Sequence, residues 1–290
     1  MLLQQLVNGL AQGAIYALMA IGFAMIMGVL GLVTFVHGEV IMVGAFAGFY
    51  AITFLHAGVF FALAAGFAAS WLLGIVIDAT CYRPFRDAPH EILLISTIGM
   101  SILLKSLAQV TLGTEQKLVP DLVGEGFIMI GDVRILHIQL FVLAVVAAIC
   151  MALQFVLYKT KVGLALRALS MDKEAAALHG VHVNRTARLG NCIGCALGGL
   201  AGVLLGSYYN AVHPIMGASA GLKAFIASVL GGLTSIPGAV VGGLLLGVFE
   251  NFAVAFSSSS YRDIVAFIIL ILVLLFKPSG IFGRKGIEKI

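Results

Sequence analysis

Few side chains in this sequence have the chemistry to bind or react, and most of them interrupt long apolar runs. Polar groups in apolar surroundings cost free energy, so those that remain there are candidates for a functional role. For each residue taken singly, an interhelical hydrogen bond or a place at the end of a run is the simpler interpretation. Lys223 and Glu250 flank a break in the apolar pattern, so they could pair with each other. The residues that qualify by position are Gln12, His37, Glu39, Lys105, Gln109, Asn191, Lys223, Glu250 and Asn251. Five of them are the main candidates: Gln12, His37, Glu39, Lys223 and Glu250.

Other spacings give little support for enzyme chemistry. No GxxxxGK[ST] loop is present to cradle a nucleotide phosphate, and no HExxH motif is present to hold zinc. His37 and Glu39 are two positions apart, a spacing that does not place them on one helix face. Cys192 and Cys195 form a CxxC pair, but no second pair or nearby histidine completes a zinc set, so packing is the simpler role. We therefore expect no catalytic residue, no metal and no cofactor.

The composition excludes a soluble globular protein. Of the 290 residues, 61% are hydrophobic and only 10% are charged, whereas soluble domains have about 25% charged residues. A membrane-spanning helix needs roughly 20 apolar residues, and because lipid offers no hydrogen bonds, the spanning segments should be helices. We expect a single all-α domain over residues 1–290, a polytopic transmembrane bundle of about eight spans plus a short or re-entrant helix near 222–233. The expected spans are residues 9–33, 39–56, 58–77, 92–113, 136–157, 189–209, 238–256 and 262–277.

One connection, residues 158–188, is longer and more basic than any other. It carries Lys159, Lys161, Arg167, Lys173, Arg185 and Arg188. Basic residues accumulate in cytoplasmic loops, so this loop should face the cytoplasm. The net charge of +4 is concentrated in such loops, which reports orientation and gives no reason to expect RNA or DNA binding.

The middle of this loop predicts a short helix. Residues 172–178 are good helix formers, Asp172 and Glu174 would lie favourably in the first turn, and Gly180 would end the helix. Its small apolar surface, formed by Ala175, Ala176 and neighbouring residues, suits docking into a groove of another protein. The alternative is a helix that lies solvated or on the lipid surface.

The charges elsewhere give an orientation for the whole chain. Residues 114–134 are mainly acidic and suit the outer side, whereas the loop at 82–87 and the basic tail suit the cytoplasm. The uncharged N-terminus is then outside. For the tail to be cytoplasmic, residues 222–233 must cross as a short helix, broken from the next one by SIPG at 235–238. The charges that carry this argument are Glu115, Asp121, Glu125 and Asp132 in the outer loop, and Lys277, Arg284, Lys285 and Lys289 in the tail.

Small residues recur at helical spacing and predict close helix packing. The clearest stripe has a glycine at every fourth position, which puts the glycines nearly on one face. Shorter stripes run through Ser235, Ala239, Gly243 and Gly247, and through Gly9, Gly13 and Ala17. Packing within the chain is the simpler interpretation, and contact with a second membrane subunit is the alternative. The main stripe is Gly190, Gly194, Gly198, Gly202 and Gly206.

Several segments together resemble a known family. Glu174, Ala175, Ala176 and Gly180 give EAAxxxG, similar to the coupling motif of permeases of ATP-binding-cassette importers. The rest of the chain resembles, in order, the branched-chain amino acid permeases of the Liv system, and within them the H-type subunit. The segments are LVNGLAQGAIYALMAIGFAMIMGVLGLVTFVHGE (6–39), YRPFR (82–86), STIGMSI (96–102), GLKAFIASVLGGLTSIPGA (221–239) and KPSGIFGR (277–284).

This resemblance implies an assembly in the bacterial inner membrane. Its expected partners are a second, M-type permease, two cytoplasmic ATPases and a binding protein that delivers leucine, isoleucine or valine. The positions that match the motif, together with Asp172 beside them, would then receive the ATPase, and the five buried polar residues would be candidates for the translocation pathway. Urea and short-amide permeases share much of the same framework and remain an alternative. An ion-coupled secondary transporter is a further one, although a proton relay would need a longer buried ionisable series.

Overall fold

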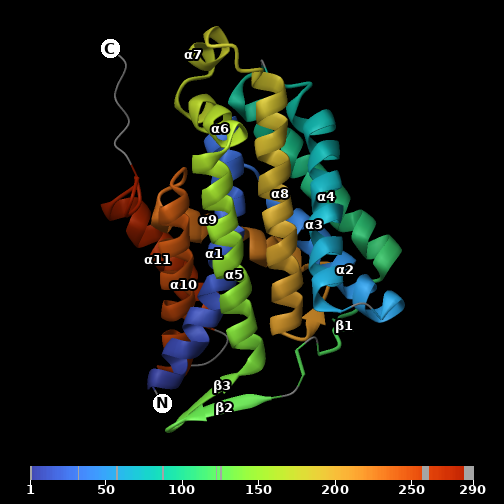
Figure 1. Cartoon of the computed structure of the whole chain (residues 1–290), viewed down its shortest axis with the longest axis vertical. Helices are drawn as coiled ribbons and strands as arrows, with labels where there is room; N and C mark the ends of the chain where they lie inside the picture. The colour runs from blue at the N-terminus through green and yellow to red at the C-terminus, as the bar shows by residue number, and fades with distance from the viewer. Residues whose placement is uncertain are drawn as a thin grey trace.

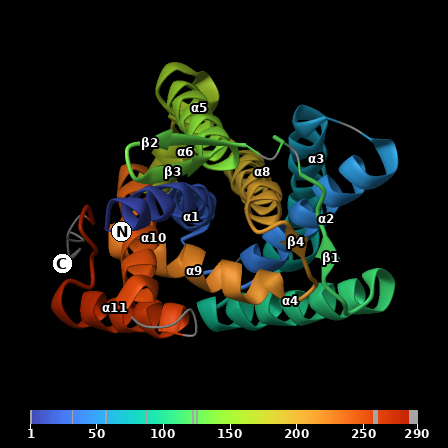
Figure 2. The ribbon, with the colours of Figure 1, turned by 90° about the horizontal axis from the view of Figure 1, so that it is seen from below.

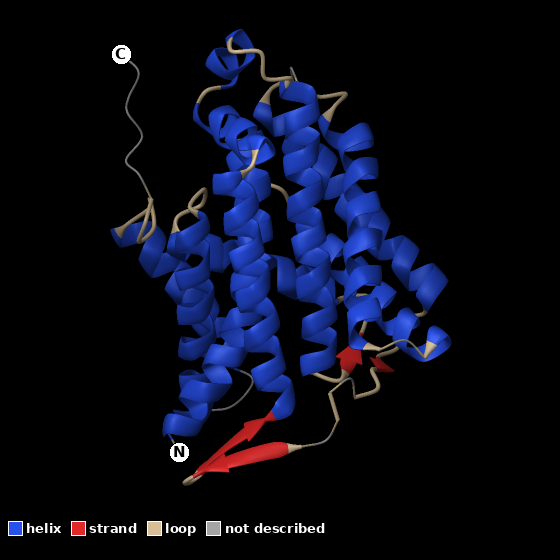
Figure 3. Ribbon diagram, in the orientation of Figure 1, coloured by secondary structure: helices blue, strands red, loops and turns tan. Residues whose placement is uncertain are grey.

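The computed structural model is a bundle of long helices with two small sheets at one end (Figures 1 and 3). It describes residues 2–31, 33–56, 58–86, 88–121, 123–124, 126–256 and 261–283. In that part of the chain, seven helices are long and apolar enough to cross a membrane. They are α1 (Leu2–Leu30), α2 (His37–Leu55), α3 (Val59–Ile77) with its π-helical continuation η1 (Asp78–Tyr82), α4 (His90–Leu112), α5 (His137–Lys159), α8 (Val183–Tyr208) and α10 (Ile236–Phe256).

The remaining elements are short. Two antiparallel pairs of strands form the sheets, β1 with β4 and β2 with β3, and in the second pair Phe127 lies opposite Leu136. The short helices are α6 (Lys161–Met171), α7 (Lys173–Leu178), α9 (Met216–Gly231) and α11 (Arg262–Phe276), and the strands are β1 (Lys117–Leu118), β2 (Phe127–Ile130), β3 (Val133–Leu136) and β4 (Ala211–Val212).

The predicted all-α class is confirmed, and the predicted runs correspond to observed helices. Seven of the eight are the long helices above, and the eighth is α11, which has 15 residues. The expected short helix is α9, whose 16 residues extend about 24 Å at 1.5 Å per residue. Both short helices are therefore marginal in length for a perpendicular crossing of about 30 Å of hydrocarbon.

One predicted boundary was wrong. Pro237 and Gly238 were expected to separate two helices, but the break lies earlier, at Gly232, whose φ is +115°. Pro237 is instead in the first turn of α10, where its missing N–H costs nothing because first-turn donors have no intrahelical partner. Ser235 accepts a hydrogen bond from the backbone N–H of Gly238 at 3.2 Å, which helps to start α10.

Helices α1 and α8 form the centre of the bundle. In an apolar 18-residue stretch of each helix, 89% of the residues of α1 and 83% of those of α8 are buried within the chain, compared with 17% for α4 and 22% for α5. Figure 2 shows α1 and α8 surrounded by α2, α3, α5 and α10, with α4 and α11 along one edge and α9 running across between that edge and α1. The core therefore lies between α1, α2, α8 and α10, and α4 and α5 are peripheral.

Glycines allow these central helices to approach each other. On α10, Gly243 and Gly247 lie directly against Ala17 and Gly13 of α1, so two of the small-residue stripes meet each other. The main stripe on α8 faces α1 and α2: Gly194 lies against the backbone of Gly22, and Gly202 against the backbone of Ile41. These contacts lie within the chain.

The two ends of the bundle differ in charge and structure. At one end, Gln4 at the start of α1 exchanges two hydrogen bonds of 2.7 Å with the backbone of Arg134 in β3. At the other end lie α6 and α7, from the basic loop (Figure 1). The last described residues also lie there, because Ile281 donates a backbone hydrogen bond to Leu230 at the end of α9. Glu125, Arg284, Lys285 and Lys289 lie outside the described residues.

Helix α2 begins in the interior of the bundle. The Nε2 atom of His37, its first residue, lies 3.2 Å from the backbone oxygen of Met19, halfway along α1. His37 and Glu39 are 1% and 2% exposed. These residues therefore do not form a turn at the surface of the bundle, because the chain returns into the bundle after α1 before α2 starts.

Candidate functional site

A buried polar cluster connects α1, α9 and α10. We call Gln12, Tyr16, Lys223, Glu250 and Asn251 the Glu250 cluster. Lys223 Nζ lies 3.1 Å from Glu250 Oε1, and Glu250 Oε2 accepts hydrogen bonds from Tyr16 at 2.8 Å and Gln12 at 3.0 Å. Asn251 donates to Gln12 at 2.9 Å, and Gln12 also contacts the Tyr16 hydroxyl. Three of the five candidate polar residues, Gln12, Lys223 and Glu250, thus lie together.

The Glu250 cluster is open on one side. Lys223 Nζ also lies 3.2 Å from Asp263 Oδ1, and Arg262 donates a 3.0 Å hydrogen bond to the Tyr209 hydroxyl. An open cavity of about 400 Å³ borders these groups. His213 also lines this cavity, and its partial burial lowers the pKa of its imidazole below the usual range, because desolvation disfavours the charged form.

His37 and Glu39 lie outside the Glu250 cluster and have different partners. Glu39 Oε1 accepts a 3.2 Å hydrogen bond from Ser101 in α4, whereas His37 points to Met19 and packs edge-on against Phe23. The two side chains therefore point in different directions, as their spacing indicates. Glu39 Oε2 and His37 Nδ1 are buried and have no hydrogen-bond partner among the described residues.

Two further patterns have structural explanations. Residues 217–221 read GASAG, which matches the GxSxG pattern of hydrolase nucleophile elbows, but they lie inside helix α9 rather than on a turn between strand and helix. Ser219 donates to the backbone oxygen of Met216. Cys192 and Cys195 are buried, and both lie against Gly74 of α3. The described part of the chain has no group of three potential metal-ligating side chains.

Helix α7 is the prominent feature at the opposite end. Asp172 is its N-cap: its Oδ1 accepts hydrogen bonds from the backbone N–H groups of Glu174 and Ala175 at 2.9 and 3.0 Å. At the other end, Gly180 has φ of +82° and donates to Ala177, while Val181 donates to Ala176. These two bonds form a Schellman motif. The six-residue helix is thus capped at both ends, which compensates for its short length.

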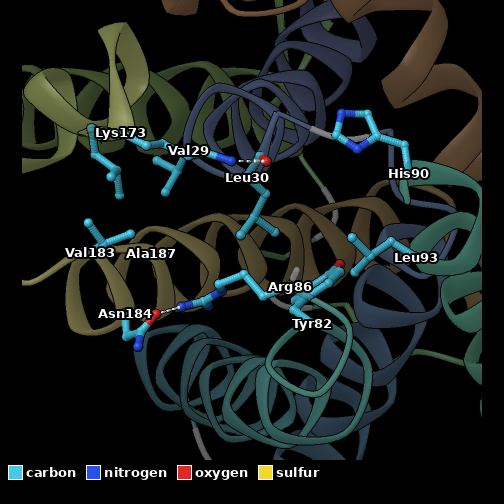
Figure 4. Close-up of a pocket in the computed structure, with 11 residues that line it drawn as sticks. Val29, Leu30, Tyr82, Arg86, His90, Leu93, Lys173, Val183, Asn184 and Ala187 are labelled. Atoms are coloured by element: carbon cyan, nitrogen blue, oxygen red, sulfur yellow. Dashed lines mark hydrogen bonds between the residues drawn. The ribbon is translucent and has the colours of Figure 1, made fainter. Parts of the chain in front are cut away.

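The exposed face of α7 differs from its attached face. Ala176 is 4% exposed, whereas Leu178 is 88% exposed; Glu174 and Ala175 are also exposed. Lys173 extends to the end of α1, where its Nζ donates a 2.9 Å hydrogen bond to the backbone oxygen of Leu30 (Figure 4). The C-terminal carbonyls of a helix lack intrahelical donors, so Lys173 satisfies one of them and connects α7 to α1.

A second cavity and an ion-pair network lie beside this connection. Figure 4 shows the cavity, about 270 Å³, between the ends of α1 and α8 and the loop after η1. Arg86 from that loop contacts Asn184 of α8. Buried Asp78 holds Arg188 at 2.8 Å and Arg86 at 3.4 Å. These contacts fix the start of α8, which directly follows α7.

Sequence reasoning missed part of the Glu250 cluster. Tyr16 lies one helical turn after Gln12, a spacing that brings side chains together, and this signal was available in the sequence. Arg262 and Asp263, which border the cluster, lie at the start of the expected span 262–277 and were not singled out. No local pattern indicated that Asp263 would meet Lys223 from α9, because that contact depends on how α9 and α11 pack.

Similarity to known proteins covers almost the whole chain. The family described as "Branched-chain amino acid transport system / permease component" matches residues 5–274. The high-affinity branched-chain amino acid transport system permease protein BraD of Pseudomonas aeruginosa is 42% identical, over 99% of this chain and 98% of its own length. LivH of Escherichia coli (strain K12) is 39% identical over 99% of this chain and 97% of its own. A probable LivH of Methanocaldococcus jannaschii is 28% identical over 92% and 88%.

Proposed function

Because this chain belongs to the branched-chain amino acid transport permease family, we propose that it forms half of the translocation pathway of an ATP-driven importer for leucine, isoleucine and valine. The seven apolar helices support a multi-pass membrane protein. The full-length similarity to BraD and LivH supports the substrate class. The chain itself is a transport subunit, and ATP hydrolysis belongs to partner subunits.

A subunit that forms half of a pathway needs a second subunit for the other half, a source of energy and a source of substrate. We propose a second, M-type permease beside this chain, two ATPases at the α6–α7 end, and a substrate-binding protein at the end that carries β1–β4. The basic residues of α6, α7 and the start of α8 support a cytoplasmic position for the first end. The N-terminus is then outside, and the described end of the chain, Lys277–Gly283, is inside.

The observation that carries the coupling proposal is the geometry of α7. An exposed helix that is capped at both ends, with Leu178 almost fully exposed, presents a rigid surface that fits a groove. We assign ATPase docking to Asp172, Glu174, Ala175, Ala176 and Gly180. Among them, Glu174 and Ala175 contact the ATPase, Ala176 anchors the helix on its own chain, and Asp172 and Gly180 hold its shape.

Uptake into liposomes tests the substrate and the energy source together. The chain is reconstituted with its co-encoded permease, ATPases and binding protein, and uptake of labelled leucine is measured with competing valine, urea and short amides. We expect ATP-dependent uptake that valine inhibits. Inhibition by urea and none by valine would reassign the substrate, and uptake that persists without ATP but collapses with an ion gradient would indicate a secondary transporter.

Substitutions on α7 test the coupling surface. A minority of interface residues, mostly near the centre of the contact, cost more than about 1 kcal/mol, or about fivefold in affinity, when they are replaced, and a charge reversal in the docking helix should belong to this group. We therefore expect Glu174→Lys to weaken association with the ATPase and to lower leucine uptake, while the permease pair remains in the membrane. Glu91→Lys is the matched control, since it adds the same charge change to an exposed residue of α4. Unchanged uptake with Glu174→Lys argues against this surface.

A further inference from the structure

We infer that the open cavity beside the Glu250 cluster is a binding subsite for a zwitterionic amino acid. The carboxylate of the ligand binds Lys223 and Arg262, and its ammonium binds Asp263. This inference rests on the proposed transport function and deepens it, because it names where in this chain the transported molecule is first held.

The cavity has the size and polarity that such a ligand needs. Its volume of about 400 Å³ lies within the range of about 300–1,000 Å³ typical of small-molecule sites. Its lining includes the charged residues Lys223, Arg262 and Asp263. A branched aliphatic side chain would lie against the apolar part of the lining, which consists of Met19, Leu205, Met216 and Ala220.

The charge of the site favours a zwitterion over an ion. Lys223 and Arg262 are balanced by Glu250 and Asp263, with Lys223 Nζ 3.1 Å from Glu250 and 3.2 Å from Asp263. A ligand with net charge would leave one charge unpaired in a partly buried site, which is costly. A zwitterion adds one charge of each sign and keeps every charge paired.

The two carboxylates have different roles because their exposures differ. The side chain of Glu250 is 0% exposed and is held by Tyr16, Gln12 and Lys223, so it is a fixed partner for the lysine. The side chain of Asp263 is 66% exposed, so it is able to move. The ligand carboxylate replaces Asp263 on Lys223, and the released Asp263 accepts the ligand ammonium.

Arg262 supplies a second donor for the ligand carboxylate. Its Nη1 is used by Tyr209, but its buried Nε has no hydrogen-bond partner among the described residues and lies 3.9 Å from Glu250 Oε2. A buried donor without a partner is unfavourable, and a small rotation of the partly exposed guanidinium would pair this donor with a carboxylate in the cavity. Arg262 lines the same cavity as Asp263.

Ligand discrimination tests the assignment on the intact permease–ATPase complex in lipid nanodiscs, without binding protein. Ligand-observed NMR measures the Kd of leucine, of 4-methylpentanoate, which lacks the ammonium, and of leucinamide, which lacks the carboxylate. We expect leucine to bind at least about tenfold more tightly than either analogue, since each analogue leaves a charged partner unpaired. Asp263→Asn should abolish only the preference over 4-methylpentanoate, and Arg262→Gln should reduce only that over leucinamide, because Lys223 still pairs with the ligand carboxylate.

The outcomes that would disprove the subsite differ from those that would disprove the transport function. Asp121→Asn removes an exposed carboxylate that does not line the cavity. This variant should therefore prefer leucine over both analogues as strongly as the wild type does. If Asp263→Asn weakens all three ligands equally, or if the wild-type complex shows no saturable leucine binding, the subsite is disproved. In either case, ATP-dependent leucine uptake with the binding protein would leave the proposed function intact.

Discussion

At the scale of single residues, the Glu250 cluster illustrates how a bundle keeps charge in its interior. Glu250 is fully buried, and its two oxygens are shared between Lys223, Tyr16 and Gln12. Desolvation of a charge is offset only when partners and hydrogen bonds are complete. The cluster therefore depends on Lys223 more than on any one neutral member.

Lys223→Met should destabilise the protein strongly, because it leaves Glu250 without its closest cation. Breaking a buried ion pair costs about 3–5 kcal/mol, which should appear as a lower melting temperature in detergent. The double variant Lys223→Met with Glu250→Gln should recover most of the loss, since it removes both charges. Lys277→Met, which changes an exposed lysine, is the control. Equal melting temperatures for the single and double variants would contradict the pairing.

The cap of α7 gives a second prediction at this scale. Asp172→Ala removes the acceptor of two backbone N–H groups, so α7 should lose about 0.5–2 kcal/mol of helix stability. Hydrogen exchange at Glu174 and Ala175 should become faster. Asp172→Asn retains an oxygen acceptor and should behave almost like the wild type. If Asp172→Ala leaves exchange unchanged, the cap does not hold the helix.

At the scale of elements, backbone contact between helices replaces side-chain interdigitation. The hydrophobic effect does not drive helices together inside lipid, so close packing of small residues contributes more. Here α8 contacts α1 and α2 through its glycine stripe, and α1 contacts α10 through another. With both stripes occupied within the chain, a second permease is expected to use other surfaces of this bundle.

Gly202→Ala tests the central packing. A methyl group at Gly202 would overlap the backbone of Ile41 and lie 3.0 Å from the backbone nitrogen of Ala45, so α8 and α2 must separate. Overpacking of this kind costs about 1–3 kcal/mol. The matched control is Gly28→Ala in α1, where nothing lies within 4 Å and the better helix former should be neutral or stabilising. If both variants lower the melting temperature by the same amount, Gly202 is not tightly packed.

Lys173 gives a test of how α7 is joined to the bundle. Its bond to Leu30 is the direct polar contact observed between α7 and the end of α1, just before the chain returns inward to His37. If the ATPases push on α7, Lys173→Met should reduce leucine uptake per ATP hydrolysed, whereas Lys173→Arg should retain most of it. If Lys173→Met transports as much leucine per ATP hydrolysed as the wild type, the coupling between α7 and α1 does not depend on this bond.

At the scale of the whole molecule, the two ends have separate tasks. The end with α6 and α7 is basic and presents a rigid helix, and the other end carries the two small sheets (Figures 1 and 3). The cavity beside the Glu250 cluster is lined in part by Ala211 of β4 and by Gln116, next to β1. It therefore opens toward the sheet end, where we place the binding protein.

Cysteine labelling tests this orientation. Leu178 is 88% exposed and Met129 is 62% exposed, at opposite ends of the bundle. A membrane-impermeant maleimide should label Met129→Cys in intact cells and Leu178→Cys only in inverted vesicles. The wild type is the background control, because Cys81, Cys192 and Cys195 are buried and Cys150 is partly buried. Labelling of both variants from one side would contradict the topology.

The sequence by itself determined the class, the approximate helices and the family of this protein. Apolar runs fix where helices lie in lipid because the backbone has no alternative hydrogen-bond partner there, and local residues such as Asp172 and Gly180 predicted a short helix in the basic loop. These signals lie within neighbouring residues of the chain, so no tertiary contact is needed to recognise them. The alternating charges of the loops also predicted the orientation that cysteine labelling tests.

Only the tertiary structure decided which distant residues meet. Gln12 and Glu250 are 238 positions apart, and their contact depends on α1 packing against α10 through glycines. The burial of His37, the connection from Lys173 to Leu30 and the approach of Asp263 to Lys223 have the same origin. The physical reason is that apolar periodicity reports a residue's surroundings along its own helix, whereas the partner across a helix interface is selected by the packing of the complete bundle.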